Sequence, residues 1–357
     1  MKKYRFALIG CGRISYKHIN AIKKIENAEL VTVCDIKEDR AKAKGEENNI
    51  PWYIDYHEML KNEDIDIVNI LVESGKHAEV FMDIAKYKRH IIIVEKPMAL
   101  TLSDADDMIR ISDENGIKLF VVKQNRFNTP VQLLRRALEE GRFGKLILGT
   151  ARVRWHRDQA YYDQDYWRGT WKYDGGVFAN QAAHHLDLLE WMMGDVESVF
   201  AKSGTFLHNI ETEDTGVAVM KFTNGALGTF EATTCTNPTD LEGSISILGE
   251  NGTVEIGGFA VNEMKVWNFK VKKEYDKEAF NCSYIPKNVY GYGHELYIRN
   301  VLETIENNTR GLVEGIEGRR SLELINAIYE SIETEKEIFL RFKPQKCKLG
   351  NNYEKNI

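Results

Sequence analysis

The amino-acid sequence predicts an α/β protein: a doubly wound parallel sheet followed by an α+β domain with an open, mostly antiparallel sheet. Up to about residue 125, short apolar runs rich in β-branched residues alternate with helical patterns. That alternation is typical of a parallel sheet covered by helices on both faces. After this point strands follow one another, separated by turn signals such as Asn224-Gly225. The chain has 357 residues, more than one ordinary core holds, so two domains are expected.

The first domain is expected over residues 1–125. Its predicted strands are short runs dominated by apolar residues: Tyr4–Ile9, Glu29–Cys34, Ile65–Leu71, His90–Val94 and Lys118–Val122. Its predicted helices occupy the intervening segments: Ser15–Ile25, Lys37–Asn48, His77–Tyr87 and Ser103–Glu114. Strands and helices therefore alternate, as a doubly wound sheet requires.

The second domain is expected over residues 126–340, with residues 341–357 as a loosely held tail rich in Lys and Asn. It contains four predicted helices: Thr129–Glu140, Ala182–Met193, Glu295–Asn307 and Glu317–Lys336. The last two are expected to pack back on the first domain. The predicted strands are Leu146–Trp155, Glu197–Ser203, Thr215–Phe222, Ala226–Thr234, Ser244–Leu248 and Thr253–Ile256.

Composition excludes several classes of protein. The net charge is −6 and no long basic run occurs, which argues against a nucleic-acid partner. No apolar run reaches the roughly 18 to 20 residues of a membrane-spanning helix, and none resembles a secretory leader. The five cysteines are scattered and never spaced as C-x-x-C. We expect free thiols in a reducing cytoplasm, and neither disulfides nor a metal site.

A glycine-rich turn follows the first predicted strand. The run from Gly10 to Ser15 has the spacing G-x-G-x-x-S, with an apolar strand before it and a helix after it. Gly10 allows a tight turn, Gly12 lets the backbone approach a pyrophosphate, and the helix opening near Ile14 directs N–H groups at that charge. Ser15 stands where Gly or Ala is usual, and it is small enough for the helix to pack.

An acidic residue ends the next strand. Asp35 lies 23 residues after Gly12, close to the spacing of about 20 found in dinucleotide-binding folds. A carboxylate there accepts hydrogen bonds from a ribose and repels a 2′-phosphate, so NAD is favoured over NADP. Lys37 and Arg40 argue the other way. The alternative interpretation is a glycine turn and a helix-capping Asp with no ligand.

Two later segments carry candidate catalytic side chains. Lys96 follows a predicted central strand, at the edge where ligands bind in open α/β sheets. Asn180 and His184 are four residues apart, so on a helix they share one face. Asp187, three residues further on, is expected to orient His184. A surface lysine and a packed or capping histidine are the alternatives.

The combination of these motifs resembles the Gfo/Idh/MocA oxidoreductases over essentially the whole chain. The segments that carry the resemblance are the glycine turn, Glu95-Lys96-Pro97, and Gly175-Gly176 with His184-His185-Leu186-Asp187. The resemblance implies an N-terminal Rossmann domain, with Lys96 and His184 flanking the substrate carbon beside the nicotinamide. It leaves open which of the two takes the proton. Asn180 replaces the Asp found in inositol-dehydrogenase-like members.

Five further segments resemble the WlbA-type subgroup, the UDP-N-acetyl-2-amino-2-deoxyglucuronate 3-dehydrogenases: Lys123–Asn128, Trp155–Tyr162, Trp167–Trp171, Leu241–Ser244 and Gly291–His294. This resemblance implies NAD-dependent oxidation of the sugar 3-hydroxyl, in the biosynthesis of diacetamido-uronic acid for bacterial surface polysaccharide, the O-antigen of lipopolysaccharide. An aminotransferase would then aminate the 3-keto sugar. A homodimer or homotetramer built through the C-terminal sheet is also implied.

The candidate site residues divide into two groups. Those expected to bind NAD are Gly10, Gly12, Arg13, Ile14, Asp35, Ile36, Leu71, Ser74, His77, Glu95, Lys96, Gln124, Trp167 and Arg168. Those expected to bind the substrate are Lys96, Arg157, Gln159, Tyr161, Tyr162, Arg168, Asn180, Gln181 and His184. The arginines offer forked donors to a pyrophosphate or carboxylate, and the aromatic rings offer flat surfaces to a base or sugar.

Two rival functions stay open at this point. A related dehydrogenase could act on another substrate, such as UDP-N-acetylglucosamine or the cyclitol myo-inositol. A non-catalytic NAD-sensing regulator could use the same fold, although it would need neither Lys96 nor His184. The residues also do not decide whether NADH is released or reoxidised in place by a 2-oxo acid.

Overall fold

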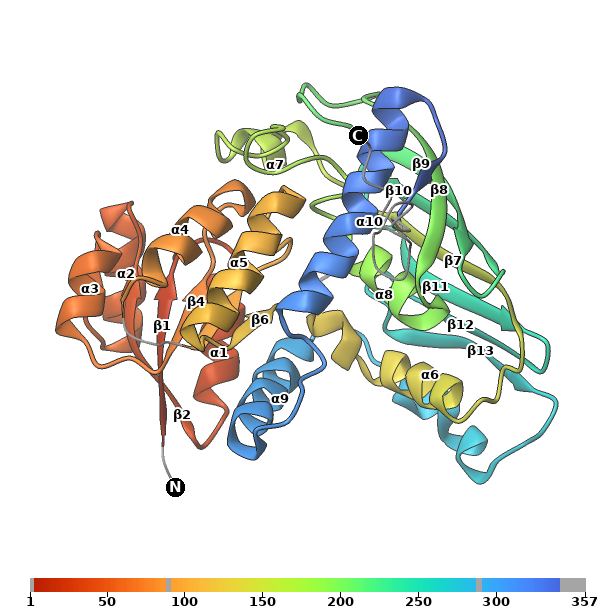
Figure 1. Ribbon diagram of the computed structural model, residues 1–357, viewed down its shortest axis with the longest axis horizontal. Coiled ribbons are helices and arrows are strands. Elements are labelled where there is room, and N and C mark those ends of the chain that lie inside the picture. The colour runs from red at the N-terminus through yellow and green to blue at the C-terminus, as the bar shows by residue number, and fades with distance from the viewer. Residues whose placement is uncertain (1–2, 88–90, 287–290, 341–357) are drawn as a thin grey trace, which may run out of the picture.

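The computed structural model describes residues 3–87, 91–286 and 291–340, which form two sheets with their helices (Figure 1). The first sheet has six strands in the order β3-β2-β1-β4-β5-β6, all paired in parallel. These strands are β1 (Tyr4–Ile9), β2 (Ala28–Cys34), β3 (Trp52–Tyr53), β4 (Ile67–Ile70), β5 (Ile91–Val94) and β6 (Leu119–Val121). The predicted fold class is confirmed.

Helices cover both faces of this sheet, which explains why its strands are continuously apolar. In β1, Phe6 and Leu8 enter one core cluster while Ala7 and Ile9 enter the other. The helices are α1 (Ser15–Lys23), α2 (Glu38–Asn48), α3 (Tyr56–Asn62), α4 (His77–Ile84) and α5 (Leu102–Asn115). The prediction missed β3 and α3, because a strand of two residues and a helix of seven carry too little periodic pattern. His90, the first residue of one predicted strand, lies outside the described residues.

The second sheet has eight strands in the order β13-β12-β11-β7-β10-β9-β8-β14. Its pairs are antiparallel except β7 with β10, which is parallel. Its strands are β7 (Leu146–Arg154), β8 (Val196–Gly204), β9 (Thr215–Phe222), β10 (Leu227–Thr233), β11 (Glu242–Gly249), β12 (Gly252–Gly257), β13 (Glu263–Phe269) and β14 (Ile338–Phe339). The prediction missed β13 and β14.

One face of the second sheet is buried beneath α6 (Thr129–Glu139), α8 (Ala183–Met193) and α10 (Gly315–Thr334). The other face is open, so β9 alternates buried and exposed residues along its length. Apolar side chains occur on the exposed positions, among them Val217, Val219 and Leu227. The predicted assembly of subunits through this sheet stays a prediction.

The last two long helices return to the first domain, as expected. From α9 (Gly293–Asn307), Tyr297, Ile298 and Val301 join a core cluster of the first sheet. Helix α10 lies between the two halves (Figure 1). Its Leu322 packs in a core cluster of the first sheet, and its Leu324 packs in the core of the second sheet. Within the described residues, no helix is both long and apolar enough to cross a membrane.

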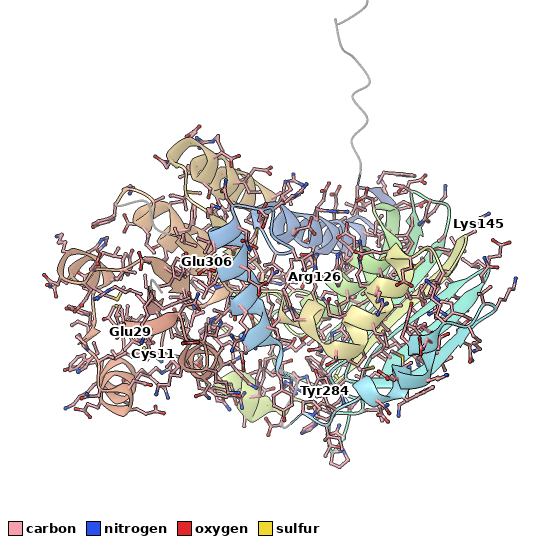
Figure 2. All side chains as sticks on the ribbon, turned by 90° about the horizontal axis from the view of Figure 1, so that it is seen from below. Cys11, Glu29, Arg126, Lys145, Tyr284 and Glu306 are labelled. Atoms are coloured by element: carbon pink, nitrogen blue, oxygen red, sulfur yellow. The ribbon has the colours of Figure 1, made fainter. Side chains whose placement is uncertain are left out.

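A buried group of charges holds the two halves together. Arg126, from the short 3-10 helix η2 (Gln124–Phe127), lies in the middle of the molecule (Figure 2). It binds both carboxylate oxygens of Asp187 on α8 at 2.8 Å, and it also binds Glu317 of α10 at 3.0 Å. Lys123 binds the same Asp187 carboxylate. Burial alone would raise the pKa of Asp187, but Arg126 and Lys123 hold it far below its usual value.

We predict that Asp187→Ala lowers the free energy of unfolding by about 3–5 kcal/mol, because it leaves two buried cations without their partner. Since the folded-state pKa of Asp187 is depressed, its contribution is complete above its ordinary value of 3.8 and is lost as the pH falls below that value. Urea melts between pH 3 and 7 measure both effects. The exposed Asp113→Ala is the control, and equal losses in the two variants would contradict the prediction.

Candidate active site

A cavity of about 990 Å³ lies at the carboxyl edge of the first sheet and is closed on one side by residues of the second domain. This size suits a dinucleotide together with part of a substrate. Every residue expected to bind NAD lines it: Gly10, Gly12, Arg13, Ile14, Asp35, Ile36, Leu71, Ser74, His77, Glu95, Lys96, Gln124, Trp167 and Arg168. Their contacts with the cofactor stay a prediction.

The two glycines of the turn have different roles. Gly10 has a φ of 105°, and a Cβ there would lie 2.5 Å from the carbonyl oxygen of Leu71. A Cβ on Gly12 would meet nothing within 4 Å, so this backbone is open to an approaching pyrophosphate. Ser15 is fully buried and its hydroxyl donates to the Gly12 carbonyl oxygen at 2.8 Å. The serine therefore stabilises the turn.

Asp35 is fixed at the end of β2, opposite the glycine turn. Its Oδ2 accepts from the Cys11 N–H at 2.7 Å and its Oδ1 from the Lys37 N–H at 2.8 Å. Each carboxylate oxygen keeps a second lone pair for a ribose hydroxyl. The turn, the carboxylate and the cavity together fit an NAD molecule.

Lys96 and His184 come from different domains and meet in this cavity. Lys96 Nζ donates to the backbone oxygen of Asn180 at 2.6 Å. Burial lowers the pKa of Lys96, although Glu95 partly opposes that shift. Burial also lowers the pKa of His184 well below its usual value, and the charge of Lys96 adds to the effect. The pair therefore offers a cationic donor beside a neutral imidazole.

Gln124 is the side chain that orients His184. Its Nε2 lies 2.9 Å from His184 Nε2, so an amide N–H donates to that nitrogen and the neutral ring carries its proton on Nδ1. The expectation that Asp187 orients His184 is wrong. Both oxygens of Asp187 are bound by Lys123 and Arg126 instead. Asp187 thus acts on the histidine through its charge and through the segment that carries Gln124.

Asn180 precedes α8 and does not share a helical face with His184, because the helix begins only at Ala183. Both residues nevertheless line the cavity. The Asn180 side-chain amide donates to the buried carboxylate of Asp174, which also accepts from the Gly169 N–H at 2.8 Å. Burial raises the pKa of Asp174 to about 6. The Asp174 carboxyl group therefore lies next to the Asn180 side chain.

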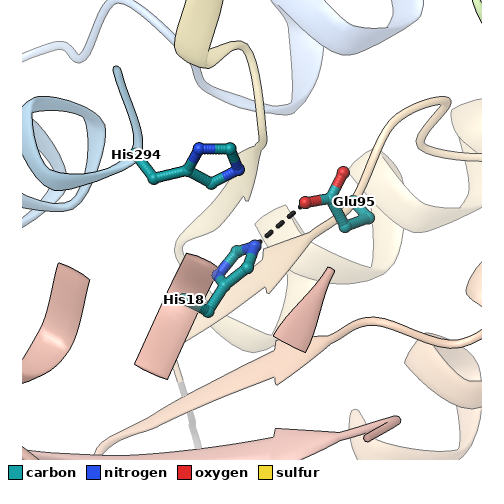
Figure 3. Close-up of side chains that lie close together, drawn as sticks. All are labelled: His18, Glu95 and His294. Carbon is teal, nitrogen blue, oxygen red and sulfur yellow. Dashed lines mark hydrogen bonds and ion pairs between the residues drawn. The ribbon is translucent and has the colours of Figure 1, made fainter. Parts of the chain in front are cut away.

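Glu95 hydrogen-bonds to His18, and His294 lies beside this pair (Figure 3). Glu95 Oε1 lies 2.9 Å from His18 Nε2, and its Oε2 accepts from the Lys96 N–H at 3.1 Å. Burial alone would raise the pKa of Glu95, but the His18 hydrogen bond and the charge of Lys96 hold it at about 2. His294 packs edge-on against His18, with ring centroids 5.4 Å apart. This cluster fixes the backbone that leads into Lys96.

The same three side chains have the chemistry of metal ligands, since their ligand atoms lie within 4.8 Å of one another. However, Asn69 Nδ2 lies 2.9 Å from His18 Nδ1 and donates to it, which leaves the ring proton on Nε2, pointing at Glu95. A protonated nitrogen has no lone pair for a metal. Among the described residues a second such group consists of His208, Asp214 and Cys235. Its Asp214 carboxylate already accepts from the backbone N–H groups of residues 206–208.

The residues expected to bind the substrate are only partly brought together. Five of them line the cavity: Lys96, Tyr161, Arg168, Asn180 and His184. Four do not: Arg157, Gln159, Tyr162 and Gln181. Arg157 pairs with Asp240 at 3.1 Å, and the buried Tyr162 hydroxyl bonds Thr234 at 2.9 Å. Substrate binding by all nine stays a prediction.

Several cavity residues were missed by the sequence analysis, notably Glu73, Asp165 and Tyr166. The signal for the last two was their place inside the stretch of aromatic and arginine residues between Tyr161 and Arg168. No local pattern marks Glu73, which lies just beyond β4 at the carboxyl edge of the sheet and accepts from the Tyr166 hydroxyl at 3.1 Å.

Comparison with known proteins supports this interpretation of the site. Residues 4–123 match the family model described as an oxidoreductase family with an NAD-binding Rossmann fold, and residues 131–255 match the GFO/IDH/MocA C-terminal domain. The WlbA dehydrogenase of Bordetella pertussis, solved in complex with NADH and UDP-GlcNAcA, is 42% identical with a TM-score of 0.92. That match covers 96% of this chain and 99% of the other.

Two further relatives extend the comparison. The WlbA dehydrogenase of Chromobacterium violaceum, also solved with NADH and UDP-GlcNAcA, is 42% identical over 96% of this chain and 97% of the other, with a TM-score of 0.90. The myo-inositol 2-dehydrogenase of Thermotoga maritima is 28% identical over 94% of this chain and 98% of its own length. The chain therefore belongs to the Gfo/Idh/MocA oxidoreductase family, as an NAD-dependent dehydrogenase of sugars or cyclitols.

Proposed function

We propose that this enzyme oxidises the 3-hydroxyl of UDP-N-acetyl-2-amino-2-deoxyglucuronate to a 3-keto sugar, with NAD as the oxidant. The observation that carries the proposal is the 42% identity, over nearly the whole chain, to two dehydrogenases solved with UDP-GlcNAcA. Identity to the inositol dehydrogenase over a similar span is only 28%. The product would be the substrate of an aminotransferase in the biosynthesis of a bacterial surface polysaccharide.

Cationic donors in the cavity suit an anionic substrate. Arg168 donates to the Tyr161 hydroxyl at 2.8 Å, while its buried Nε has no hydrogen-bond partner. Arg13 lies over the Tyr161 ring, 5.9 Å from its centroid, and lines the same cavity. A nucleotide uronate carries a pyrophosphate and a carboxylate that such groups recognise. A neutral cyclitol has no group that needs them.

The proposed reaction assigns one role to each catalytic residue. The neutral His184 accepts the proton of the sugar 3-hydroxyl at Nε2, because its lowered pKa keeps it unprotonated. The sugar hydroxyl takes the place of the Gln124 amide at that nitrogen. The Lys96 ammonium stabilises the negative charge that develops on the same oxygen. The glycine turn and Asp35 would hold NAD, which when bound would supply the acceptor for the hydride of the sugar carbon.

We predict that Lys96→Ala and His184→Ala each lower kcat by about 10²–10⁴-fold, the usual contribution of a positioned acid–base group. NADH binding should persist in both, because the glycine turn and Asp35 are unchanged. Steady-state rates and NADH fluorescence titrations measure the two effects separately. Near-normal rates in both variants would contradict the proposed catalytic roles of Lys96 and His184.

The pH dependence of kcat should be bell-shaped. Activity is lost on the acidic side when His184 gains a proton, with a midpoint well below its ordinary pKa of 6.5. Activity is lost on the alkaline side when Lys96 loses its proton, with a midpoint below 10.5. A kcat profile for the wild type and for His184→Gln checks this, since the acidic limb should vanish in the variant. An unchanged acidic limb would assign it to another group.

The substrate is tested by following NADH formation with UDP-N-acetylglucosaminuronate, UDP-N-acetylglucosamine or myo-inositol. We expect turnover with the first alone, and an aminotransferase with glutamate removes the ketone so that equilibrium does not hide the reaction. The likeness to the inositol dehydrogenase favours a cyclitol as the second candidate. Turnover of myo-inositol alone would establish it. Tight NAD binding without any turnover would indicate a regulator.

A further inference from the structure

Two cations stand at the ribose-binding end of the cofactor cavity. Lys37 directly follows the loop that leaves β2, and Arg40 lies in the first turn of α2. Both line the cavity with Asp35, and the Lys37 N–H donates to the Asp35 carboxylate. In dinucleotide-binding folds, an arginine near this acidic residue accommodates the 2′-phosphate of NADP. These cations would therefore attract the phosphate that Asp35 repels.

The structure shows where these two positive charges are directed. Arg40 donates to Asp165 Oδ1 at 3.0 Å, and Lys37 Nζ lies 3.5 Å from the same oxygen. Asp165 belongs to the second domain, just beyond α7 (Gln159–Asp163), which projects over the first domain (Figure 1). Its side chain is only 11% exposed. The aspartate thus reaches the cofactor pocket from 125 residues further along the chain than Arg40.

Asp165 is ionised in this position. Burial alone would raise its pKa, but the hydrogen bond and charge of Arg40, with the charges of Arg168 and Lys37, hold the pKa below its usual value. The Arg168 Nε lies 3.7 Å from Asp165 Oδ2. The carboxylate therefore carries a full negative charge between the cofactor end and the substrate end of the cavity.

We propose that Asp165 is a specificity-determining residue, which makes the pocket select NAD over NADP by occupying Arg40 and Lys37. A 2′-phosphate carries about −1.5 to −2 charges and binds where cationic donors are available. Here the donors of Arg40 are directed at Asp165, and the carboxylate adds repulsion of its own. The neutral 2′-hydroxyl of NAD meets neither obstacle.

Other contacts hold the loop in place when the Asp165 charge is removed. Tyr166 donates to Glu73 at 3.1 Å, and the Gly75 N–H donates to the Tyr173 carbonyl at 2.8 Å. These two links join the same loop to the first domain without the aspartate. Asp165→Asn therefore removes the charge and keeps the position of the loop.

The test compares the dissociation constants of NADPH and NADH, measured by fluorescence titration of the full chain. Asp165→Asn should raise the NADPH affinity roughly tenfold or more, the worth of a charge-assisted hydrogen bond. NADH affinity should stay near the wild-type value. Asp163→Asn is the matched control, because this exposed residue at the end of α7 accepts from the Gln159 side chain and does not line the cavity. Asp165→Glu should restore the wild-type preference.

A double-mutant cycle with Arg40→Ala identifies the route of the effect. Most of the gain in NADPH affinity should disappear when Arg40→Ala is added to Asp165→Asn, leaving only the parts that come from Lys37 and from lost repulsion, whereas Arg40→Ala alone should barely change NADPH binding. The cycle is repeated with Asp35→Ser, so that repulsion from Asp35 does not mask the gain. Equal changes in NADPH and NADH affinity would show that Asp165 only holds the loop. A gain that is undiminished by Arg40→Ala would likewise overturn the proposal.

Discussion

The buried charges of Asp187, Lys123 and Arg126 are the constraint on which the catalytic geometry depends. Ions removed from water are stable only when their partners are close and correctly placed, so this cluster tolerates little movement. It fixes the segment Lys123–Phe127 against α8, and that segment also carries Gln124. Gln124 then meets His184, one turn before Asp187 on the same helix. A structural ion cluster and a catalytic histidine are thus held by the same two elements.

The fold explains why each domain contributes different residues to the site. Parallel strands bring their carboxyl ends to one edge, which collects the glycine turn, Asp35 and Lys96 in the first domain. His184, Asn180 and Arg168 come from the second domain, so the cavity is complete only when both halves are docked. Burial at this junction also lowers the pKa values of Lys96 and His184. The docked interface therefore creates both the geometry and the proton affinities of the site.

The sequence predicted those features of the fold and the site that depend on a local residue pattern. Continuous apolar runs identified the longer parallel strands, and the glycine turn with Asp35 identified the edge of the sheet that lines the cofactor cavity. Short elements such as β3 escaped because two residues carry no period. The partners of Asp187 were missed for another reason. Spacing along a helix shows which residues are near His184, but not that Lys123 and Arg126, more than 60 residues away, bind that carboxylate more strongly.

Asp165 is a second residue whose partners are distant in the sequence, and its position bears on the choice of cofactor. From the sequence, Lys37 and Arg40 conflict with Asp35, because local residues alone leave the cations without an anion. The fold resolves the conflict by bringing an aspartate from the second domain to them. The loop that carries it also carries Trp167 and Arg168, which line the same cavity. Cofactor selection and substrate contact would then depend on one segment, so changes to the substrate loop that displace Asp165 should also alter the choice between NAD and NADP.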